Sequence, residues 1–574
     1  MKKVKLFSFA LAALMLGACS SEDVIDNGDQ GTVLPGEKGY ISLGINLPTT
    51  PSTRATTNDN FADGTADEYA VDDATLIVLE GTSESTATVT GVYKLTLPGG
   101  TNVGTATDNI TTSYQLTQAI NKPTGNNNLY ALVVLNKDNV ELDGFNGKKL
   151  SELNTAFDTN YDFLNEDGHI LMTNAPLYTK PGEKAAPADG NLVTLTEINP
   201  KNVFTTEAEA KANPAANVYV ERALAKVTVT ANADGYTPES NAKFTGAKVE
   251  GYALDVVNKN SYLVRNIPEG AAWWNYASSS VTSNGYRFVG SAPVGDNLYR
   301  TYWGVDPNYD NYDASEDFVL AEKTPSLTPI ETASYCKENT FNVANQKQDG
   351  TTRVIVAAKI TVEGFGDGET FYTLDNNKDV IYSSTNIQKE IKSYFLNNKD
   401  VKAALASSLD ETASESSIDV DLAFDKGAGN VTVTDVTFKD PTIFKNDEVP
   451  AELKKDGAAY ESAIAEINSH VYSCYAGGIA YYPVMIKHFG DDLTPWSAEG
   501  KTESYPGNAA EANWLGRYGV LRNNWYDISV TSIKSIGYAE VPDVNPTFDD
   551  PVESWISVKI NVLSWAKRTQ NVDL

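Results

Sequence analysis

Histidine, the side chain best suited to acid–base chemistry and metal binding at neutral pH, occurs only three times in the 574 residues. His169, His470 and His488 are well separated, and no two of them have the spacing of a histidine-based zinc motif. A complete phosphate-binding loop and a nucleophile elbow are also absent from the sequence. We therefore predict a protein that is not an enzyme, with no catalytic residues, no bound metal and no cofactor.

Acidic residues are too numerous to mark a site by themselves. Five of them fall within twelve residues and have the oxygen chemistry of a calcium site, but they lack the glycine and ligand spacing of an EF-hand loop. They are Asp306, Asp310, Asp313, Glu316 and Asp317. Among 76 carboxylates, a glycosidase-type pair cannot be selected. The glycine-rich run at 364–368 lacks the full dinucleotide fingerprint, and we expect a hairpin turn there.

The chemistry that the sequence does support is modification of the chain itself, first at Cys19. Three lysines precede an apolar run over residues 6–16, which is too short to span a bilayer. Small residues directly before Cys19 form a lipobox, in which the thiol is lipidated and becomes the mature N-terminus. An ordinary signal peptide that contains a cysteine is the alternative. We predict a signal over residues 1–19 and an outer-membrane lipoprotein precursor.

A second candidate site of modification is Arg54, the first arginine of the chain. It lies in a Pro-, Ser- and Thr-rich stretch at 48–57, whose composition is typical of an exposed loop. An Arg-specific protease would find the bond between Arg54 and Ala55 accessible.

Two stretches with the same residue pattern lie near the two ends of the chain, and the first lies between Cys19 and Arg54. In each, four apolar residues alternate with small or polar ones, the pattern of a half-buried β-strand. Either strand could therefore fill the same groove. Leu563 and Trp565 break the second alternation, and we expect a bulge there. The apolar positions are Ile41, Leu43, Ile45 and Leu47 in the first stretch and Ile556, Val558, Ile560 and Val562 in the second.

Composition indicates an exported, mainly β protein with two or more domains. The formal charge of −31 repels phosphate backbones, so nucleic acid is not an expected partner. Thirty tyrosines, with many Thr, Val, Asn and Gly residues, favour strands and turn-rich loops. Beyond Cys19 only Cys336 and Cys474 remain, either as a disulfide or as two separate thiols.

Strand-like runs alternate with turns along most of the chain, and we place a domain boundary within 205–217. A strand-like run at 218–230 opens the second half. We expect three helices. The first lies near 150–157, and the second starts at about Thr385, with Gln388 in the capping-box position. The third has an apolar stripe formed by Tyr460, Ile464, Ile467 and Val471. Helices between strands of a β domain indicate insertions rather than an α/β fold. The runs are 74–79, 92–97, 129–135, 249–257, 353–362, 418–424, 431–438, 479–486 and 526–530.

Taken together, the lipobox, the early strand with its arginine loop and the C-terminal strand resemble the fimbrillins of type V pili, in particular the minor fimbrium shaft subunit. Further matching stretches are 220–227, 522–526, 532–536 and the end of the chain at 562–565 and 572–574. At Ser564 the sequence departs from the family's better-known member, which has proline before the tryptophan, so the resemblance does not define the bend after Leu563.

The resemblance implies two transthyretin-like antiparallel β-sandwich domains with helical insertions, at 55–215 and 216–540. It implies a propeptide at 20–54 that carries the removable strand, and a linker with a donor strand at 541–574. Cleavage after Arg54 would open a groove in the N-terminal domain, and the next subunit's C-terminal strand would fill it. The implied partners are further copies in a head-to-tail polymer, accessory and anchor pilins, an Arg-specific protease, and host or bacterial surface receptors at the cell surface.

Two other classes of function compete with a shaft subunit. A tip or accessory subunit, or a surface adhesin, would bind glycan or protein through exposed aromatic residues. The candidates are Trp273, Trp274, Tyr299, Tyr302 and Trp303, for which core packing is the alternative. A glycan-handling enzyme would need a catalytic constellation that the sequence does not offer. The presence of both a cleavage loop and a donor-like tail favours the shaft.

Overall fold

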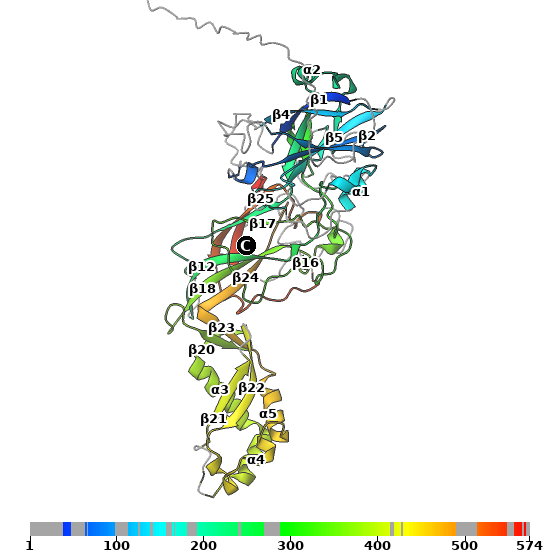
Figure 1. The fold of residues 1–574 in the computed structure, drawn as a ribbon. Helices are drawn as coiled ribbons and strands as arrows, with labels where there is room; N and C mark the ends of the chain where they lie inside the picture. Colours follow the sequence, from blue (N-terminus) through cyan, green and yellow to red (C-terminus); the bar gives the residue numbers. More distant parts are fainter. Residues whose placement is uncertain are drawn as a thin grey trace, which may run out of the picture.

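The protein is an elongated row of three lobes, seen here in a computed structural model (Figure 1). We call them the first, middle and distal lobes, after their order along the row. The predicted mainly β class is confirmed, because each lobe contains a sheet and most of the strand pairs are antiparallel. The structure describes residues 38–47, 64–65, 67–97, 113–123, 127–137, 142–155, 163–165, 167–180, 192–238, 243–268, 288–411, 413, 418–425, 429–489, 514–547, 556–564 and 568–569.

The first lobe is built on one large sheet with the strand order β3-β2-β5-β6-β10-β1-β4, and β9 adds to β5. Two neighbouring strands of this sheet, β2 and β5, are almost continuously apolar because both of their faces are covered. The bounds are β1 Lys38–Asn46, β2 Ala74–Gly81, β3 Thr88–Leu95, β4 Ser113–Asn121, β5 Asn128–Leu135, β6 Met172–Asn174, β9 Thr196–Ile198 and β10 Ala216–Arg222, with helices α1 Leu150–Thr155 and α2 Glu207–Ala212 and 3-10 turns η1 Asp67–Tyr69, η2 Asp143–Phe145 and η3 Pro200–Asn202.

The middle lobe packs two sheets around one core, β17-β11-β25-β26-β27 and β12-β18-β24. A small sheet, β14-β15-β7-β8, joins strands from both sides of the lobe junction. The bounds are β7 Leu177–Tyr178, β8 Leu192–Val193, β11 Ala225–Thr230, β12 Phe244–Asp255, β13 Val257–Asn258, β14 Val289–Gly295, β15 Leu298–Thr301, β16 Phe318–Val319, β17 Ser334–Cys336, β18 Arg353–Val362, β24 Ile479–Met485, β25 Asn524–Ile533, β26 Ile556–Ser564 and β27 Arg568–Thr569, with η5 Val343–Asn345.

The run predicted at 218–230 is two strands rather than one. β10 pairs with β1 and β6 in the first lobe, whereas β11 pairs with β17 and β25 in the middle lobe. The chain therefore passes from one sheet to the other at 223–224, and β10 belongs to the sheet that precedes the proposed boundary at 215. The residues at the change of sheet are Ala223 and Leu224, so no glycine or proline marks it in the sequence.

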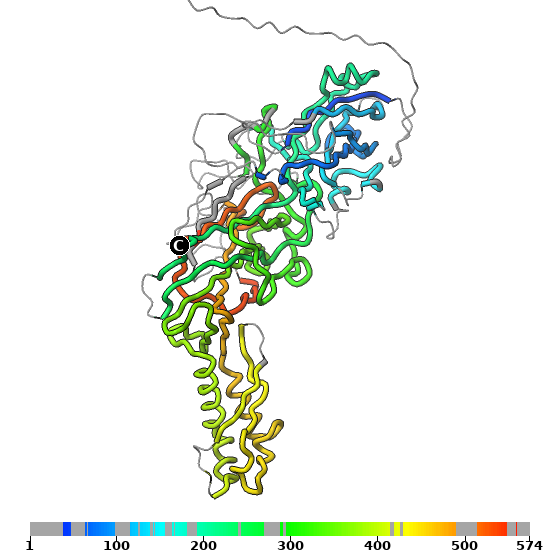
Figure 2. Tube along the Cα trace, turned by 60° about the vertical axis from the view of Figure 1, so that its left-hand side comes forward, coloured from blue at the N-terminus to red at the C-terminus, as the bar shows by residue number. Residues whose placement is uncertain are grey.

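The distal lobe is an insertion between two middle-lobe strands, β18 and β24, and it extends away from the first lobe (Figure 2). Its sheet, β20-β19-β23-β22-β21, shares a separate core with three helices. The bounds are β19 Phe371–Leu374, β20 Asn377–Tyr382, β21 Val420–Asp425, β22 Gly429–Phe438, β23 Tyr472–Tyr475, α3 Ser384–Asn397, α4 Lys399–Ser408 and α5 Ala458–Ile467, with 3-10 turns η7 Pro441–Ile443, η8 Lys445–Asp447, η9 Ala451–Leu453 and η10 Ala476–Gly478.

Three local predictions in this region are wrong. Helix α3 is capped by Ser383, whose hydroxyl accepts a hydrogen bond from the Asn386 amide at 3.3 Å, so the expected box at Thr385 and Gln388 is absent. Helix α5 ends before Val471, which is exposed. The turn at 364–368 joins β18 to β19, which lie in different sheets, and so it is not a hairpin.

Candidate assembly strands

Strand β1 is an internal strand of the first-lobe sheet. Its whole length, Lys38–Asn46, pairs antiparallel with β4, and Leu43–Asn46 also pairs in parallel with β10. An isolated bridge holds the start of the strand, where Tyr40 and Phe204 exchange backbone hydrogen bonds at 2.7 and 2.9 Å. If β1 were removed, β4 and β10 would both be left with unpaired backbone groups facing one gap.

The four alternating apolar side chains of this region all lie in the first-lobe core. Ile41, Leu43 and Ile45 are at most 1% exposed, and Leu47, which directly follows β1, is 3% exposed. They share one cluster with residues of β2, β4, β5 and β10. The predicted inward face is thus the face that the fold buries, and its loss would open an apolar groove.

Between these positions, β1 carries residues that are small or hydrogen-bonded. The hydroxyl of Ser42 accepts a hydrogen bond from Gln115 Nε2 at 3.1 Å. Gly44 lies beside Asn217 of β10, and a Cβ atom at Gly44 would stand 2.5 Å from Asn217 Oδ1. The polar face of β1 is therefore fitted to its neighbours, with least room at Gly44.

Strand β26 pairs antiparallel with β25 of its own middle lobe from Ile556 to Ser564, and the short β27 follows on its other side. Val558 is 5% exposed and packs into the middle-lobe core, with its backbone opposite Val530. The side chains of Ile556, Ile560, Val562 and Leu563 lie outside the described residues. In this state the C-terminal strand is docked on the subunit that carries it.

The expected bulge at Leu563 is wrong. Leu563 pairs with Trp525 in unbroken register, and the irregularity lies in β25 between Val530 and Ser532. A bulge inserts an extra residue into one strand, and the sequence of β26 alone cannot reveal that its partner carries it. Trp565 lies outside the described residues.

Other predicted site residues fall outside the described part of the chain. They are Cys19, Arg54, Ala55, Trp273 and Trp274. Lipidation and cleavage therefore stay predictions.

Residues shortly after the predicted cleavage site form a buried contact between the first and middle lobes. Glu68 of η1 pairs with Lys226 Nζ at 2.6 Å, and both side chains are at most 6% exposed. Tyr335 donates to the same carboxylate oxygen at 2.6 Å. The Lys226 ammonium also lies 4.1 Å from the ring centroid of Trp525, the residue of β25 that pairs with Leu563. A chain of contacts thus joins η1 to the strand that holds β26.

The ionisation of Glu68 follows from these partners. Burial raises the pKa of its carboxyl group, but the hydrogen bonds from Lys226 and Tyr335 and the Lys226 charge outweigh burial, so the pKa is lowered overall. Tyr335 responds in the opposite direction, because burial and the neighbouring carboxylate raise the pKa of its hydroxyl. The contact is therefore an ion pair at neutral pH.

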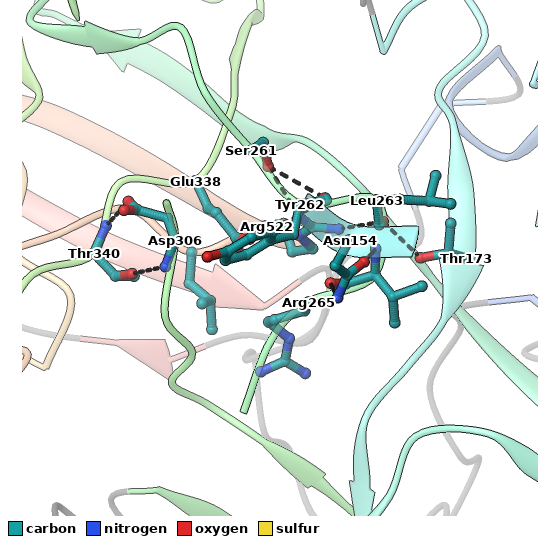
Figure 3. A network of polar contacts seen from close by, with 12 residues as sticks. Asn154, Thr173, Ser261, Tyr262, Leu263, Arg265, Asp306, Glu338, Thr340 and Arg522 are labelled. Carbon is teal, nitrogen blue, oxygen red and sulfur yellow. Dashed lines mark hydrogen bonds and ion pairs between the residues drawn. The ribbon is translucent and has the colours of Figure 1, made fainter. Parts of the chain in front are cut away.

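A second polar network fastens the lobes together (Figure 3). Arg522, just before β25, donates to Leu263 O at 2.9 Å and to Glu338 Oε1 at 2.7 Å. From the first lobe, Thr173 Oγ1 donates to the same Leu263 oxygen at 3.2 Å, and Asn154 Nδ2 donates to Val264 O at 2.9 Å. The segment around Leu263 is thereby held from both sides. Sequence reasoning noted the stretch at 522–526 but not this role.

The remaining candidate ligands have structural surroundings. Asp306 is buried, and its carboxylate accepts hydrogen bonds from the backbone N–H of Thr340 at 2.6 Å and from Asn258 Nδ2 at 3.1 Å. Burial raises the pKa of this carboxyl group. The ring of His488 bonds Tyr526 OH at 2.7 Å in the core. Within the described residues, no three His, Cys, Asp or Glu side chains are placed to hold a metal ion.

Cys336 and Cys474 are not joined in a disulfide, so of the two alternatives left by the sequence the structure shows two separate thiols. Trp303 is 1% exposed within a core cluster, and Tyr299 and Tyr302 pack against that cluster, so core packing is the observed role of these three aromatic residues. In the part of the chain that the structure describes, no helix is long and apolar enough to cross a membrane.

Comparison with known proteins identifies the C-terminal part of the chain. The sequence model of the fimbrillin C-terminal region of major fimbrial subunit proteins (type IV) matches residues 473–571, which run from β23 to beyond β27. None of the curated proteins matches the chain.

Solved structures give only distant likenesses. A protein of Parabacteroides distasonis ATCC 8503, named as a cell adhesion protein, has a TM-score of 0.34 at 11% identity, over 93% of this chain and 99% of its own. One of Bacteroides eggerthii DSM 20697, with the same kind of name, has a TM-score of 0.33 at 10% identity, over 93% and 98%. A fimbrial assembly protein of P. distasonis has 0.21 at 12%, over 57% and 84%.

The fold defines a mainly β protein whose internal first strand and C-terminal strand share one pattern. Residues 473–571 of this protein are similar to the C-terminal region of fimbrillins.

Proposed function

We propose that this chain is the shaft subunit of a cell-surface fimbrium that polymerises by strand exchange. It is exported as an outer-membrane lipoprotein anchored through Cys19. An Arg-specific protease cuts between Arg54 and Ala55 and releases the segment that contains β1. The C-terminal strand of a neighbouring subunit then fills the vacated groove, and a head-to-tail polymer grows.

The observation that carries this proposal is the internal position of β1. A strand that precedes a cleavable loop and lies between two partners leaves two open edges and an apolar groove when it departs. Only another strand with the same alternation restores both the backbone hydrogen bonds and the side-chain pockets. The chain carries such a strand in β26.

The two strands match beyond their apolar positions. When Ile556 is set at the place of Ile41, Val558, Ile560 and Val562 fall at Leu43, Ile45 and Leu47. Ser557 then coincides with Ser42 and Asn561 with Asn46, so two polar positions are identical. Lys559 falls at Gly44, where Asn217 must move aside to admit a side chain.

The free energy gained by burying the donor strand favours strand exchange once the bond after Arg54 is cut. Burial of four aliphatic side chains contributes roughly 6–12 kcal/mol, at about 1.5–3 kcal/mol each. The C-terminal strand must first leave β25. In the groove it can pair with β4 along its whole length and with β10 along half of it, whereas in the docked state it pairs with β25 and the short β27. Before cleavage, β1 is covalently attached and competes at a high effective concentration, so assembly waits for the protease.

Protease treatment of the purified precursor tests the proposal. We expect ladders that resist mild denaturant, and none with Arg54→Ala, while a chain that begins at Ala55 forms ladders without protease. Arg54→Lys keeps the charge and should behave like Arg54→Ala, which separates cleavage from charge. If a chain truncated before Trp555 still polymerises, the C-terminal strand is not the donor.

The anchor is tested separately. A labelled fatty acid should be incorporated into the precursor and lost with Cys19→Ala, whereas Cys336→Ala keeps the label. Retention of label in Cys19→Ala would contradict the lipoprotein assignment.

A further inference from the structure

The segment that connects β25 to β26 is bound to the middle lobe along its first part. Val541 is 3% exposed and packs with Ile355, Ala357 and Tyr481, and its amide donates to Lys323 O at 2.9 Å. This covers the face of β18 opposite to the main core. The start of the connection is therefore part of the lobe's packing.

The next residues are held by charged side chains. Arg353, which forms a buried ion pair with Asp255 at 2.7 Å, donates from Nη2 to Pro542 O at 2.6 Å. Lys323 Nζ lies 2.7 Å from Asp543 and 3.2 Å from Val541 O. A buried guanidinium that uses its donors on a carboxylate and a carbonyl fixes both in one geometry.

A last contact is made at Thr547. The backbone N–H of Gln348 donates to Thr547 O at 2.8 Å, and the side-chain Nε2 of Gln348 donates to Thr547 Oγ1 at 3.1 Å. Contacts therefore occur at both ends of 541–547, which we call the docked segment.

We propose that the docked segment stays bound during assembly and that the donor strand leaves its own subunit only beyond Thr547. This inference rests on the proposed strand exchange and adds where the exchanged arm begins. The contacts of the docked segment with the middle lobe then form a fixed attachment point, which we call the mooring, and its position limits how far the donor strand can reach.

The position of the mooring limits the spacing between subunits. From Thr547 to Ile556 the chain has nine residue steps and spans at most about 30 Å when extended. If the arm began at Val541, fifteen steps would reach about 50 Å. The neighbour's groove must therefore open close to the Thr547 end of the docked segment.

A disulfide staple tests the mooring without removing any buried charge. Gln348→Cys with Thr547→Cys is made in a background of Cys336→Ala and Cys474→Ala, and the precursor is oxidised and then cut by the Arg-specific protease. Both positions lie at the surface or near it. A matched staple, Ser529→Cys with Lys559→Cys, joins residues that pair across β25 and β26 and locks the strand itself.

We expect the first staple to leave ladder formation and the fibre's axial repeat, measured by electron microscopy, as they are in the reduced protein. The second staple should abolish ladders until a reductant is added. If the first staple blocks polymerisation that its reduced form supports, the mooring is wrong while strand exchange stands. If the reduced proteins fail to polymerise, or if the second staple has no effect, the proposed function fails and the mooring with it.

Discussion

β1 and β26 have the same alternation and different surroundings. β1 lies inside a sheet, with β4 on one side and β10 on the other, and its apolar residues are buried in the first-lobe core. β26 is bounded by β25 along its length and by only two residues of β27. Loss of β1 opens a groove with two strand edges, whereas loss of β26 uncovers one long edge. The alternation makes the strands interchangeable, and the neighbours decide which one is donor and which one leaves a receptor.

The largest effect that separates the two strands is expected from a charge on the buried face. Leu43→Asp puts an unpaired carboxylate in the core and should destabilise the uncut precursor by more than about 4 kcal/mol in urea unfolding. After cleavage the altered strand is gone, so ladders should form as in the parent. Val558→Asp should instead prevent ladders.

Leu43→Met is the matched control and should change the precursor's stability by less than about 1.5 kcal/mol. If Leu43→Asp still blocks ladders after complete removal of the propeptide, β1 is more than a placeholder for the donor.

A smaller loss is expected at the lobe junction. Glu68→Gln leaves the Lys226 ammonium buried without its carboxylate, and removal of one partner of a buried ion pair typically destabilises by about 3–5 kcal/mol. Urea unfolding of the precursor measures it. Glu363→Gln, in the exposed pair with Lys243, is the control and should have little effect. Equal effects would mean that the junction does not contribute to stability.

The same pair gives a pH dependence. The pKa of Glu68 is lowered in the folded protein, so its stabilisation is fully present above the ordinary carboxyl pKa of about 4.3 and is lost as the pH falls through the lower folded value. The stability difference between parent and Glu68→Gln should therefore shrink between pH 6 and pH 3. A difference that stays constant would show that the carboxylate charge is not the cause.

The smallest effect is expected at Gly44. The atom that a new Cβ would meet is the end of the Asn217 side chain, which can rotate away. Alanine is also the better residue inside a strand, so Gly44→Ala should change the precursor's stability by less than about 1 kcal/mol. A loss of several kcal/mol in thermal unfolding would mean that the groove cannot admit Lys559 in the proposed register.

Local periodicity predicted the strands well, because a strand with one buried face has an apolar residue at every second position. The stretch at 431–438 coincides with the main part of β22 for this reason, whereas the stretch at 353–362 coincides with β18 because that strand is buried on both faces and is almost continuously apolar. What a strand pairs with is not local. The run at 218–230 gave no sign that β10 and β11 belong to different sheets, and Leu563 gave no sign that its partner strand carries the bulge.

The polar contacts were beyond sequence reasoning for a related cause. Glu68 is one of 76 acidic residues, and only the fold brings it to Lys226, 158 positions away. The family resemblance implied a linker that starts at residue 541, and the docked segment is its first part. Its restraint comes from Arg353 and Gln348, which no pattern in the segment itself could indicate.

The most direct test of strand exchange is a cross-link between two different subunits in the fibre. In the proposed register Lys559 takes the place of Gly44 beside Asn217, so one subunit carries Asn217→Cys and the other Lys559→Cys, each without the native cysteines. Oxidation of the cleaved mixture should give a disulfide between subunits, and the uncut mixture should give none. Strand exchange would be contradicted if position 559 forms no link to position 217 in the cleaved fibre, while a separate variant with Ser529→Cys and Lys559→Cys in one subunit still forms its internal disulfide after cleavage.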